Sequence, residues 1–354
     1  MKFELKKLPP ENDVESKSVL KLCANAHRHL AELKGISQTI PNQVILINTL
    51  PMLEAKDSSA IENIITTNDD MFKEDLFGDF LSNSSAKEVK NYTTALKKGF
   101  ELVKDNNLLL NRHILEVQEI IEHNKAGFRK LPGTDLRNLE TDEIVYTPPQ
   151  HFDEISDLMS NLETFINDDG ICQFDPLVKM AIIHYQFESI HPFYDGNGRT
   201  GRIINILFLV LKGLLDIPIL YLSRYIIKNK SNYYKLLQNV RDNSNWEEWI
   251  SFILAGIAEV SKETIDIINS IKKLMLEYKH SIREKYNFYS QDLINNLFKH
   301  PYTKIDFLEN DIKVSRQTAA KYLDQLSEDG FLKKEKIGNN NYYVNEPLFR
   351  LFNK

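Results

Sequence analysis

The sequence is poor in the residues that mark disulfide-rich and loop-rich proteins. Only two cysteines, Cys23 and Cys172, occur among 354 residues, and no CxxC pair is present, which excludes a disulfide scaffold and a cysteine-rich zinc site. With 13 glycines and 12 prolines, the chain has few of the turn residues that an all-β architecture needs. Leu, Ile, Lys and Glu dominate instead, and this composition favours helices.

Long hydrophobic runs are also missing. The most apolar window, residues 203–222, is interrupted by Lys212, Asp216 and Pro218, which indicates a buried helix rather than a membrane span. The first sixteen residues contain no apolar stretch of signal-peptide length. We therefore expect a cytoplasmic protein that has no membrane partner.

An excess of positive charge is absent as well. The chain has 44 Lys+Arg against 50 Asp+Glu, a net charge of −6, unlike a generic nucleic-acid coat or a cationic membrane binder. A hydrophobic fraction of 42% is enough for a core and excludes disorder as the main state. The length favours two or three domains, because single cores rarely grow beyond about 250–300 residues.

Hydrophobic spacing predicts a mainly α protein. Residues 66–85 predict an exposed connection, and residues 127–149 predict a β-hairpin with strands near 128–130 and 144–147. Two helices, 177–188 and 203–211, are apolar almost all round, as expected in the middle of a bundle. The other predicted helices cover residues 15–34, 41–56, 86–103, 108–123, 151–167 and 246–299.

A polar, glycine-rich segment, HPFYDGNGRTGR at residues 191–202, joins the two most apolar helices. Gly196 and Gly198 permit a tight turn and close approach to a ligand. The start of the following helix presents free N–H groups to an anion. Arg199 and Arg202 are three residues apart, so both guanidinium groups can lie on one face near that end.

The same segment carries a carboxylate and an imidazole. Asp195 is the kind of hard ligand that holds Mg²⁺ jointly with phosphates, and His191 can accept a proton near neutral pH. A lone histidine or a lone GNG is usually structural, but the combination predicts a phosphate cradle with one metal ligand and one base. The base would take a proton from a hydroxyl while N–H groups, Mg²⁺ and arginine stabilise phosphate charge.

This segment resembles the Fic-domain signature, HPFx(D/E)GNGRxxR, at every specified position. Fic proteins are helical and mostly transfer AMP from ATP to a hydroxyl side chain of a target protein. The resemblance implies that His191 deprotonates a target Tyr, Ser or Thr, that Asp195 holds Mg²⁺ and that Phe193 anchors the loop. Glycine rather than lysine at 198 favours AMP transfer over phosphate transfer. The implied ATP-binding residues in this segment are Gly196, Asn197, Gly198, Arg199, Thr200, Gly201 and Arg202.

The resemblance, which covers roughly residues 40–260, also gives the hairpin a role. It implies that residues 127–149 form a flap that aligns the target by strand addition, with Ile144, Val145 and Tyr146 facing the nucleotide. Tyr233 would border the adenine. A plain structural hairpin and a core tyrosine remain the alternatives for these residues.

Residues 57–65 allow two interpretations. Ser59 and Glu62 have the spacing of a capping box at a helix start. The segment also resembles the (S/T)xxxE(G/N) inhibitory motif of Fic proteins, with Ser58, Glu62 and Asn63 in place. A glutamate delivered to Arg202 would compete with the γ-phosphate, so this interpretation predicts an auto-inhibited protein. In some relatives this glutamate orients a water that removes AMP, which leaves the reverse activity open.

The last fifty residues differ from the rest. Residues 301–354 carry a net charge of +1 against −7 for the remainder. Helical segments 305–309 and 315–327, with a hairpin after them, resemble a winged helix, which serves as a DNA reader or as a protein-docking module. The basic residues that it would present are Arg316, Lys321, Lys333, Lys334 and Lys336.

We therefore predict an N-terminal helical region (1–100), a Fic core (101–260), a helical connection (261–300) and a winged-helix domain (301–354). The expected activity is Mg²⁺- and ATP-dependent AMP transfer to a protein hydroxyl. The alternatives are a DNA-binding regulator whose Fic site senses a nucleotide and an enzyme that uses another nucleotide or diphosphate donor. Self-modification and a homodimer are left open.

Overall fold

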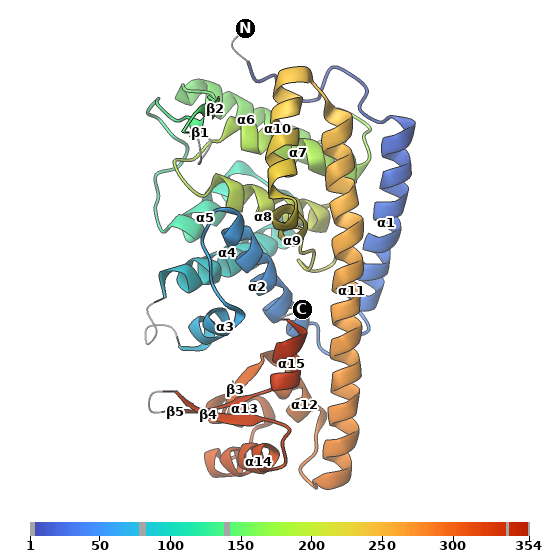
Figure 1. Ribbon diagram of the computed structural model, residues 1–354, viewed down its shortest axis with the longest axis vertical. Coiled ribbons are helices and arrows are strands. Elements are labelled where there is room, and N and C mark those ends of the chain that lie inside the picture. The colour runs from blue at the N-terminus through green and yellow to red at the C-terminus, as the bar shows by residue number, and fades with distance from the viewer. Residues whose placement is uncertain (1–3, 78–82, 138–141, 338–339, 353–354) are drawn as a thin grey trace.

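The computed structural model describes residues 4–77, 83–137, 142–337 and 340–352. It confirms a mainly helical fold with small antiparallel sheets (Figure 1). The strands are β1 (Leu136–Arg137), β2 (Ile144–Tyr146), β3 (Tyr302–Lys304), β4 (Lys333–Ile337) and β5 (Asn340–Val344). The helices are α1 (Lys17–Ser37), α2 (Val44–Ile61), α3 (Asn68–Phe77), α4 (Ser84–Asn106), α5 (Asn111–Glu122), α6 (Phe152–Asn167), α7 (Pro176–Ile190), α8 (Asn197–Leu211), α9 (Ser223–Lys228), α10 (Lys230–Asn243), α11 (Trp246–Lys285), α12 (Gln291–Lys299), α13 (Ile305–Ile312), α14 (Arg316–Glu328) and α15 (Glu346–Leu351).

Helices α7 and α8 form the centre of the bundle, as their apolar sequences predict. Helix α7 begins at an Asp175 N-cap, whose side chain accepts a hydrogen bond from the Leu177 N–H, with Pro176 in the first turn. This is a favourable start, because the cap satisfies a free N–H and proline has none to lose. Both helices are buried on nearly every side, and each packs against the other. The loop between them is therefore held at both ends by rigid core elements.

Helix α11 is 40 residues long and runs the length of the molecule beside α1 (Figure 1). Its first half packs on α7 and its last turns contact α12 and α15. Near its end, the Tyr278 hydroxyl donates to the Phe331 carbonyl at 2.7 Å. Two of the predicted domain limits fall inside helices: 100/101 lies within α4, and 260/261 lies within α11.

The C-terminal domain, α12 to α15, contains the predicted pair of helices, α13 and α14, and the predicted hairpin, β4–β5. Strand β3 pairs antiparallel with β5, so the sheet order is β3-β5-β4. Ser315 caps α14 by accepting a hydrogen bond from the Thr318 N–H. The domain lies beside α2 and α3 in Figure 1, and α12 contacts α2.

The prediction that residues 66–85 form an exposed connection is wrong where the structure describes them. Residues 68–77 form α3, and Met71 and Phe72 are buried. Phe72 packs against the rings of His300, Phe349 and Phe352, with centroids 5.1–5.9 Å apart. The local sequence is polar, and the burial of these two side chains depends on the packing of α3 against α2 and α4 and, for Phe72, on the C-terminal domain.

Two further boundaries differ from prediction. The first strand of the hairpin is β1, at residues 136–137 rather than 128–130, and it pairs with β2 through an irregular register. The helical stretch predicted over 246–299 is interrupted between α11 and α12. Residues 138–141 of the predicted flap lie outside the described residues.

Candidate active site

The loop between α7 and α8 is closed by its own side chains. His191 is the C-cap of α7 in the left-handed conformation, with φ 48° and ψ 58°. The Asn197 side chain accepts from the Phe193 N–H and donates to the Phe193 carbonyl, both at 2.8 Å. Phe193 is fully buried against the rings of Phe128 and Phe187. The loop therefore has one conformation, with His191 at its start and the helix N-terminus at its end.

Close packing explains the two glycines of the GNG turn. Gly196 has φ +76°, a conformation that side chains disfavour, and a Cβ there would lie 2.5 Å from Glu122 Oε1. A Cβ at Gly198 would lie 2.5 Å from Glu62 Oε1 and 2.9 Å from Arg202 Nη1. Both glycines thus let the backbone approach charged side chains that come from other helices.

Arg202 is bound by the end of α2. Its Nε donates to Ser58 Oγ at 2.7 Å, and its Nη2 donates to the Ser58 carbonyl at 2.9 Å and to Glu62 Oε1 at 2.7 Å. Burial opposes the charge of this guanidinium, but the attraction of Glu62 holds the pKa of Arg202 above its ordinary value. Ser58 and Glu62 therefore take up the hydrogen-bond donors of Arg202, the guanidinium that the resemblance predicts to hold phosphate.

Arg199 binds three carboxylates from three helices. Its Nε donates to Glu62 Oε2 at 2.8 Å, its Nη1 to Glu88 Oε2 at 2.9 Å and its Nη2 to Glu122 Oε1 at 2.7 Å. Glu62 thus bridges Arg199 and Arg202 with its two oxygens. Both guanidinium groups are buried, so these charge-assisted bonds are screened little by water.

The segment 58–63 ends a helix instead of beginning one, so the capping-box interpretation of Ser59 and Glu62 is wrong. Glu62 is the C-cap of α2. Asn63 follows with φ 64°, and its Oδ1 accepts a bond from Lys230 Nζ at 3.2 Å. Because α2 terminates at this point, the Glu62 side chain reaches past the helix end to both arginines.

A buried carboxyl anchors α2 to its neighbours. Glu54 accepts bonds from the Ser223 N–H at 3.0 Å and from the Tyr92 hydroxyl at 3.1 Å. Burial raises the pKa of Glu54 to about 7, although these hydrogen bonds and Arg202 act in the opposite direction. Glu54 therefore links α2 to α4 and to the start of α9, one turn before Ser58.

The His191 imidazole is surrounded by buried surface and positive charge. Burial, followed by the charges of Arg129 and Arg241, lowers the pKa of His191 to about 3. The imidazole is therefore neutral near pH 7 and can accept a proton. Glu188, one turn earlier in α7, has a pKa raised by burial to about 7.

Asp195 is exposed beside the helix N-terminus. Its Oδ1 accepts from the Gly196 N–H at 2.7 Å. No group of three or more His, Cys, Asp or Glu side chains in the described ranges could hold a metal ion. A single carboxylate is nevertheless a fitting donor for Mg²⁺, because this ion takes one or two protein carboxylates and completes its shell with water and phosphate oxygens.

The remaining predicted ATP-binding residues are divided between the site and the core. Ile144 and Val145 are 52% and 45% exposed, whereas Tyr146 is buried and its hydroxyl donates to the Ser189 carbonyl at 2.8 Å. Tyr233 is also buried, with its hydroxyl 2.9 Å from His184 Nε2. On α8, Thr200 is buried, and Gly201 lies against Glu188 and Phe187 of α7.

Four charged residues of the site were missed by the sequence analysis. They are Glu88, Glu122, Arg129 and Arg241. Each lies in an ordinary helix or loop without a local motif, and only the packing of distant segments brings them to the loop. Nothing in the neighbouring sequence separates them from the many exposed charges of the chain.

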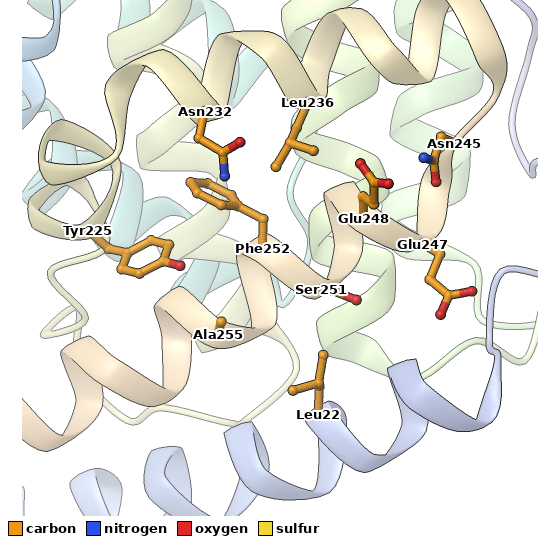
Figure 2. A pocket seen from close by; sticks show the side chains of 10 residues that line it. All are labelled: Leu22, Tyr225, Asn232, Leu236, Asn245, Glu247, Glu248, Ser251, Phe252 and Ala255. Atoms are coloured by element: carbon orange, nitrogen blue, oxygen red, sulfur yellow. The ribbon is translucent and has the colours of Figure 1, made fainter.

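A separate pocket of about 760 Å³ lies where α1, α9, α10 and α11 meet (Figure 2). Tyr225, Phe252 and Leu236 supply its apolar wall, and Glu247 and Glu248 supply carboxylates at the start of α11. None of the loop residues 191–202 lines it. The residues that line this pocket are therefore different from those of the proposed anion site.

Comparison with known families agrees with this geometry. Three family models match consecutive parts of the chain: "Fic/DOC family N-terminal" over residues 20–101, "Fic/DOC family" over 109–209, and "Protein adenylyltransferase SoFic-like, C-terminal domain" over 274–348. Together they cover most of the chain, which belongs to the Fic/DOC family.

Curated relatives are similar over part of their length. "Protein adenylyltransferase Fic" of Aedes aegypti is 28% identical over 167 residues, which is 47% of this chain and 30% of the relative. "Protein adenylyltransferase fic-1" of Caenorhabditis briggsae is 26% identical over 106 residues, 28% of this chain and 20% of the relative. The chain thus spans about a third or less of these relatives.

Solved structures share the fold. A Fic family protein from Desulfovibrio desulfuricans G20 has a TM-score of 0.62 at 20% identity, covering 95% of this chain and 98% of its own. Fic-1 (residues 134–508) from C. elegans has a TM-score of 0.55 at 20% identity, covering 72% and 74%. Within the ranges that the structure describes, every helix is too short or too polar to cross a membrane.

Proposed function

We propose that this protein is an adenylyltransferase that transfers AMP from ATP to a Tyr, Ser or Thr hydroxyl of a target protein and releases diphosphate. The observation that carries the proposal is the α7–α8 loop, which holds a neutral imidazole, an exposed carboxylate and a helix N-terminus with two arginines within twelve residues. The printed names of the curated relatives support the same reaction.

In the proposed reaction, His191 takes the proton of the target hydroxyl while the hydroxyl oxygen forms a bond to the α-phosphorus of ATP. The bond between the α-phosphorus and the diphosphate leaving group breaks. The N–H groups at the start of α8 bind the phosphate oxygens, where the helix dipole favours negative charge. Asp195 would hold Mg²⁺, which would supply positive charge to the phosphate oxygens. The side chains of Ile144 and Val145 are the exposed part of β2 and would face the nucleotide.

We further propose that Glu62 keeps the protein auto-inhibited. Its carboxylate binds Arg202 and Arg199 at once, so neither guanidinium is free for the β- and γ-phosphates. Ser58, the other residue of the proposed inhibitory motif, also binds Arg202 through both its hydroxyl and its carbonyl, and the contact of Glu62 with Arg199 adds a second arginine to the one expected from the sequence. Withdrawal of α2 would free all three of these bonds on Arg202 and one of the three on Arg199.

The decisive test is intact-mass spectrometry of the Glu62→Gly variant after incubation with ATP and Mg²⁺. We expect a mass increase of one AMP through self-modification, or transfer to an added target, and no increase in the Glu62→Gly/His191→Ala double variant. An added phosphate instead of AMP would contradict the proposed reaction. No gain in Glu62→Gly over the parent would contradict the inhibitory role.

The DNA-binding alternative receives little support from the C-terminal domain. Lys334 pairs with Asp324, Lys333 pairs with Glu335 and Glu346, and Arg316 pairs with Asp306. Phosphate binding needs surplus positive charge, and these cations are compensated within the domain. A salt-dependent shift of random duplex DNA by the full chain would restore the alternative.

A further inference from the structure

Arg129 is a buried cation that is compensated by backbone carbonyls alone. Its side chain is 0% exposed. Its Nε donates to the His191 carbonyl at 2.7 Å, and its Nη2 donates to the carbonyls of Pro149 at 2.5 Å and Ile190 at 3.3 Å. Across the described ranges it forms no ion pair with a carboxylate. Burying a charge is costly unless it is well bonded, so this arrangement needs a reason.

Two of the carbonyls that the Arg129 guanidinium binds, those of Ile190 and His191, belong to the end of α7. The last carbonyls of a helix have no partner within the helix and carry its partial negative charge. The Arg129 guanidinium satisfies those of Ile190 and His191, and the Arg129 N–H donates to the Pro192 carbonyl at 2.8 Å. The guanidinium thus caps the helix end on which the base is mounted.

The second half of the flap is attached to the same helix end. The Tyr146 hydroxyl donates to the Ser189 carbonyl at 2.8 Å, and the Arg241 guanidinium lies 3.9 Å from the Tyr146 ring centre. Four successive carbonyls, those of residues 189–192, therefore accept bonds from Arg129 or Tyr146. Both sides of the flap base are joined to the residues around His191.

We propose that Arg129 is a positioning residue that holds His191 and the base of the flap, residues 127–149, as one unit. The inference rests on the proposed function, in which the flap aligns the target hydroxyl and His191 takes its proton. His191 and the flap must keep a fixed position relative to each other, because a displacement of about 1 Å at a reacting group costs roughly 100-fold in rate. The rigid guanidinium fixes this relative position, because it donates hydrogen bonds to the His191 carbonyl on one side and to the Pro149 carbonyl on the other.

Charge contributes in the same direction. After burial, Arg129 and Arg241 are the groups that lower the pKa of His191, and the buried Glu188 lies one turn away. Removing the positive charge at 129 should therefore raise the His191 pKa, whereas a change in stability alone would leave it where it is. This difference separates positioning from a merely structural role.

Two variants test the inference in full-length Glu62→Gly protein. Arg129→Met removes both the charge and the bonds, and Arg129→Lys keeps the charge but loses the planar fork. Arg112→Met, on the exposed face of α5, is the matched control. The measurements are kcat and KM for ATP, together with NMR detection of the His191 imidazole as the pH is lowered from 8 to about 3, where the parent imidazole is expected to titrate.

For Arg129→Met we expect kcat to fall about 100-fold, with a much smaller rise in the KM for ATP, because the α8 anion site is untouched and only the flap side of the nucleotide site is loosened. The half-titration pH of His191 should rise. Arg129→Lys should lose about tenfold in kcat, between the parent and Met, with His191 still neutral. Arg112→Met should match its parent in every measurement.

Unchanged kcat in Arg129→Met would overturn the inference, and so would a kcat loss with an unmoved His191 titration. If Arg129→Met does not fold, Arg129→Lys tests the inference instead. Its kcat should fall, and its NMR shifts should change only at residues 189–192 and in the flap. If Glu62→Gly lacks AMP transfer, the proposed reaction fails, while the His191 titration still tests the positioning role without activity.

Discussion

The two ends of the α7–α8 loop solve the problem of buried positive charge in opposite ways. At the anion end, Arg199 and Arg202 are compensated by carboxylates from α2, α4 and α5. At the base end, Arg129 is compensated by main-chain carbonyls of residues 149, 190 and 191. The first set of partners belongs to movable side chains, and the second belongs to the backbone of the core.

This difference determines which end can be regulated. Glu62 can leave the arginines when α2 shifts, and a triphosphate carries the same kind of oxygen to replace it. The carbonyls around His191 cannot leave without unfolding the end of α7. We infer that the anion end is the adjustable part of the site and that the base end is permanently assembled.

The largest expected effect concerns the base end. In Glu62→Gly protein, His191→Ala should reduce AMP transfer roughly 1000-fold, because a positioned general base contributes about 10²–10⁴-fold. Transfer of labelled AMP measures the loss, and His280→Ala, on the exposed face of α11, is the control. Retained transfer would mean that the base lies elsewhere.

The next effect concerns the anion end. Glu62→Gly should raise transfer about 10- to 100-fold over the parent, since hydrogen bonds to charged groups are worth about 1.5–3 kcal/mol. Glu88→Gln removes one negative charge that faces Arg199 and leaves Glu62 in place, so its gain should stay below about threefold. Initial rates of self-labelling distinguish them. Equal gains would show that Arg199, rather than Arg202, controls the site.

Glu54 tests whether the adjustable end depends on pH. Its pKa is raised from 4.5 to about 7, so between these values the folded chain binds more protons than the unfolded chain, and stability falls as pH rises. Glu54→Gln should remove this loss, on the order of 1–3 kcal/mol. The change in Tm on substitution should therefore be more favourable at pH 8 than at pH 5. An identical change at both pH values would contradict the raised pKa.

The smallest effect concerns the support of α2 from the C-terminal domain. Asn68 accepts a bond from Lys56 of α2 at 2.7 Å and donates to the Phe352 carbonyl at 2.7 Å. Asn68→Ala should loosen the inhibitory segment and raise basal AMP transfer about two- to fivefold. Asn310→Ala, on the exposed side of α13, is the control. A gain of the same size in the control would remove the distinction between the two positions.

Local signals predicted much of this protein. Helix patterns predicted both ends of α6 and α7 to within two residues. They predicted the end of α8 but not its start, which lies at Asn197, inside the predicted loop. The prediction of an exposed connection over residues 66–85 failed because α3 packs against α2 and α4, and because Phe72 lies against rings near the other end of the chain. The capping-box interpretation failed because the same spacing of Ser59 and Glu62 occurs at the end of α2.

The sequence by itself determined the helical class, and it placed the proposed turn, base, metal ligand and anion site within residues 191–202, one short segment whose groups need only local geometry. Only the tertiary structure decided what surrounds that segment. Ion pairs to Glu62, Glu88 and Glu122, and the capping of α7 by Arg129, join residues up to 140 positions apart in the chain. Such contacts depend on how helices pack, and no local pattern records them.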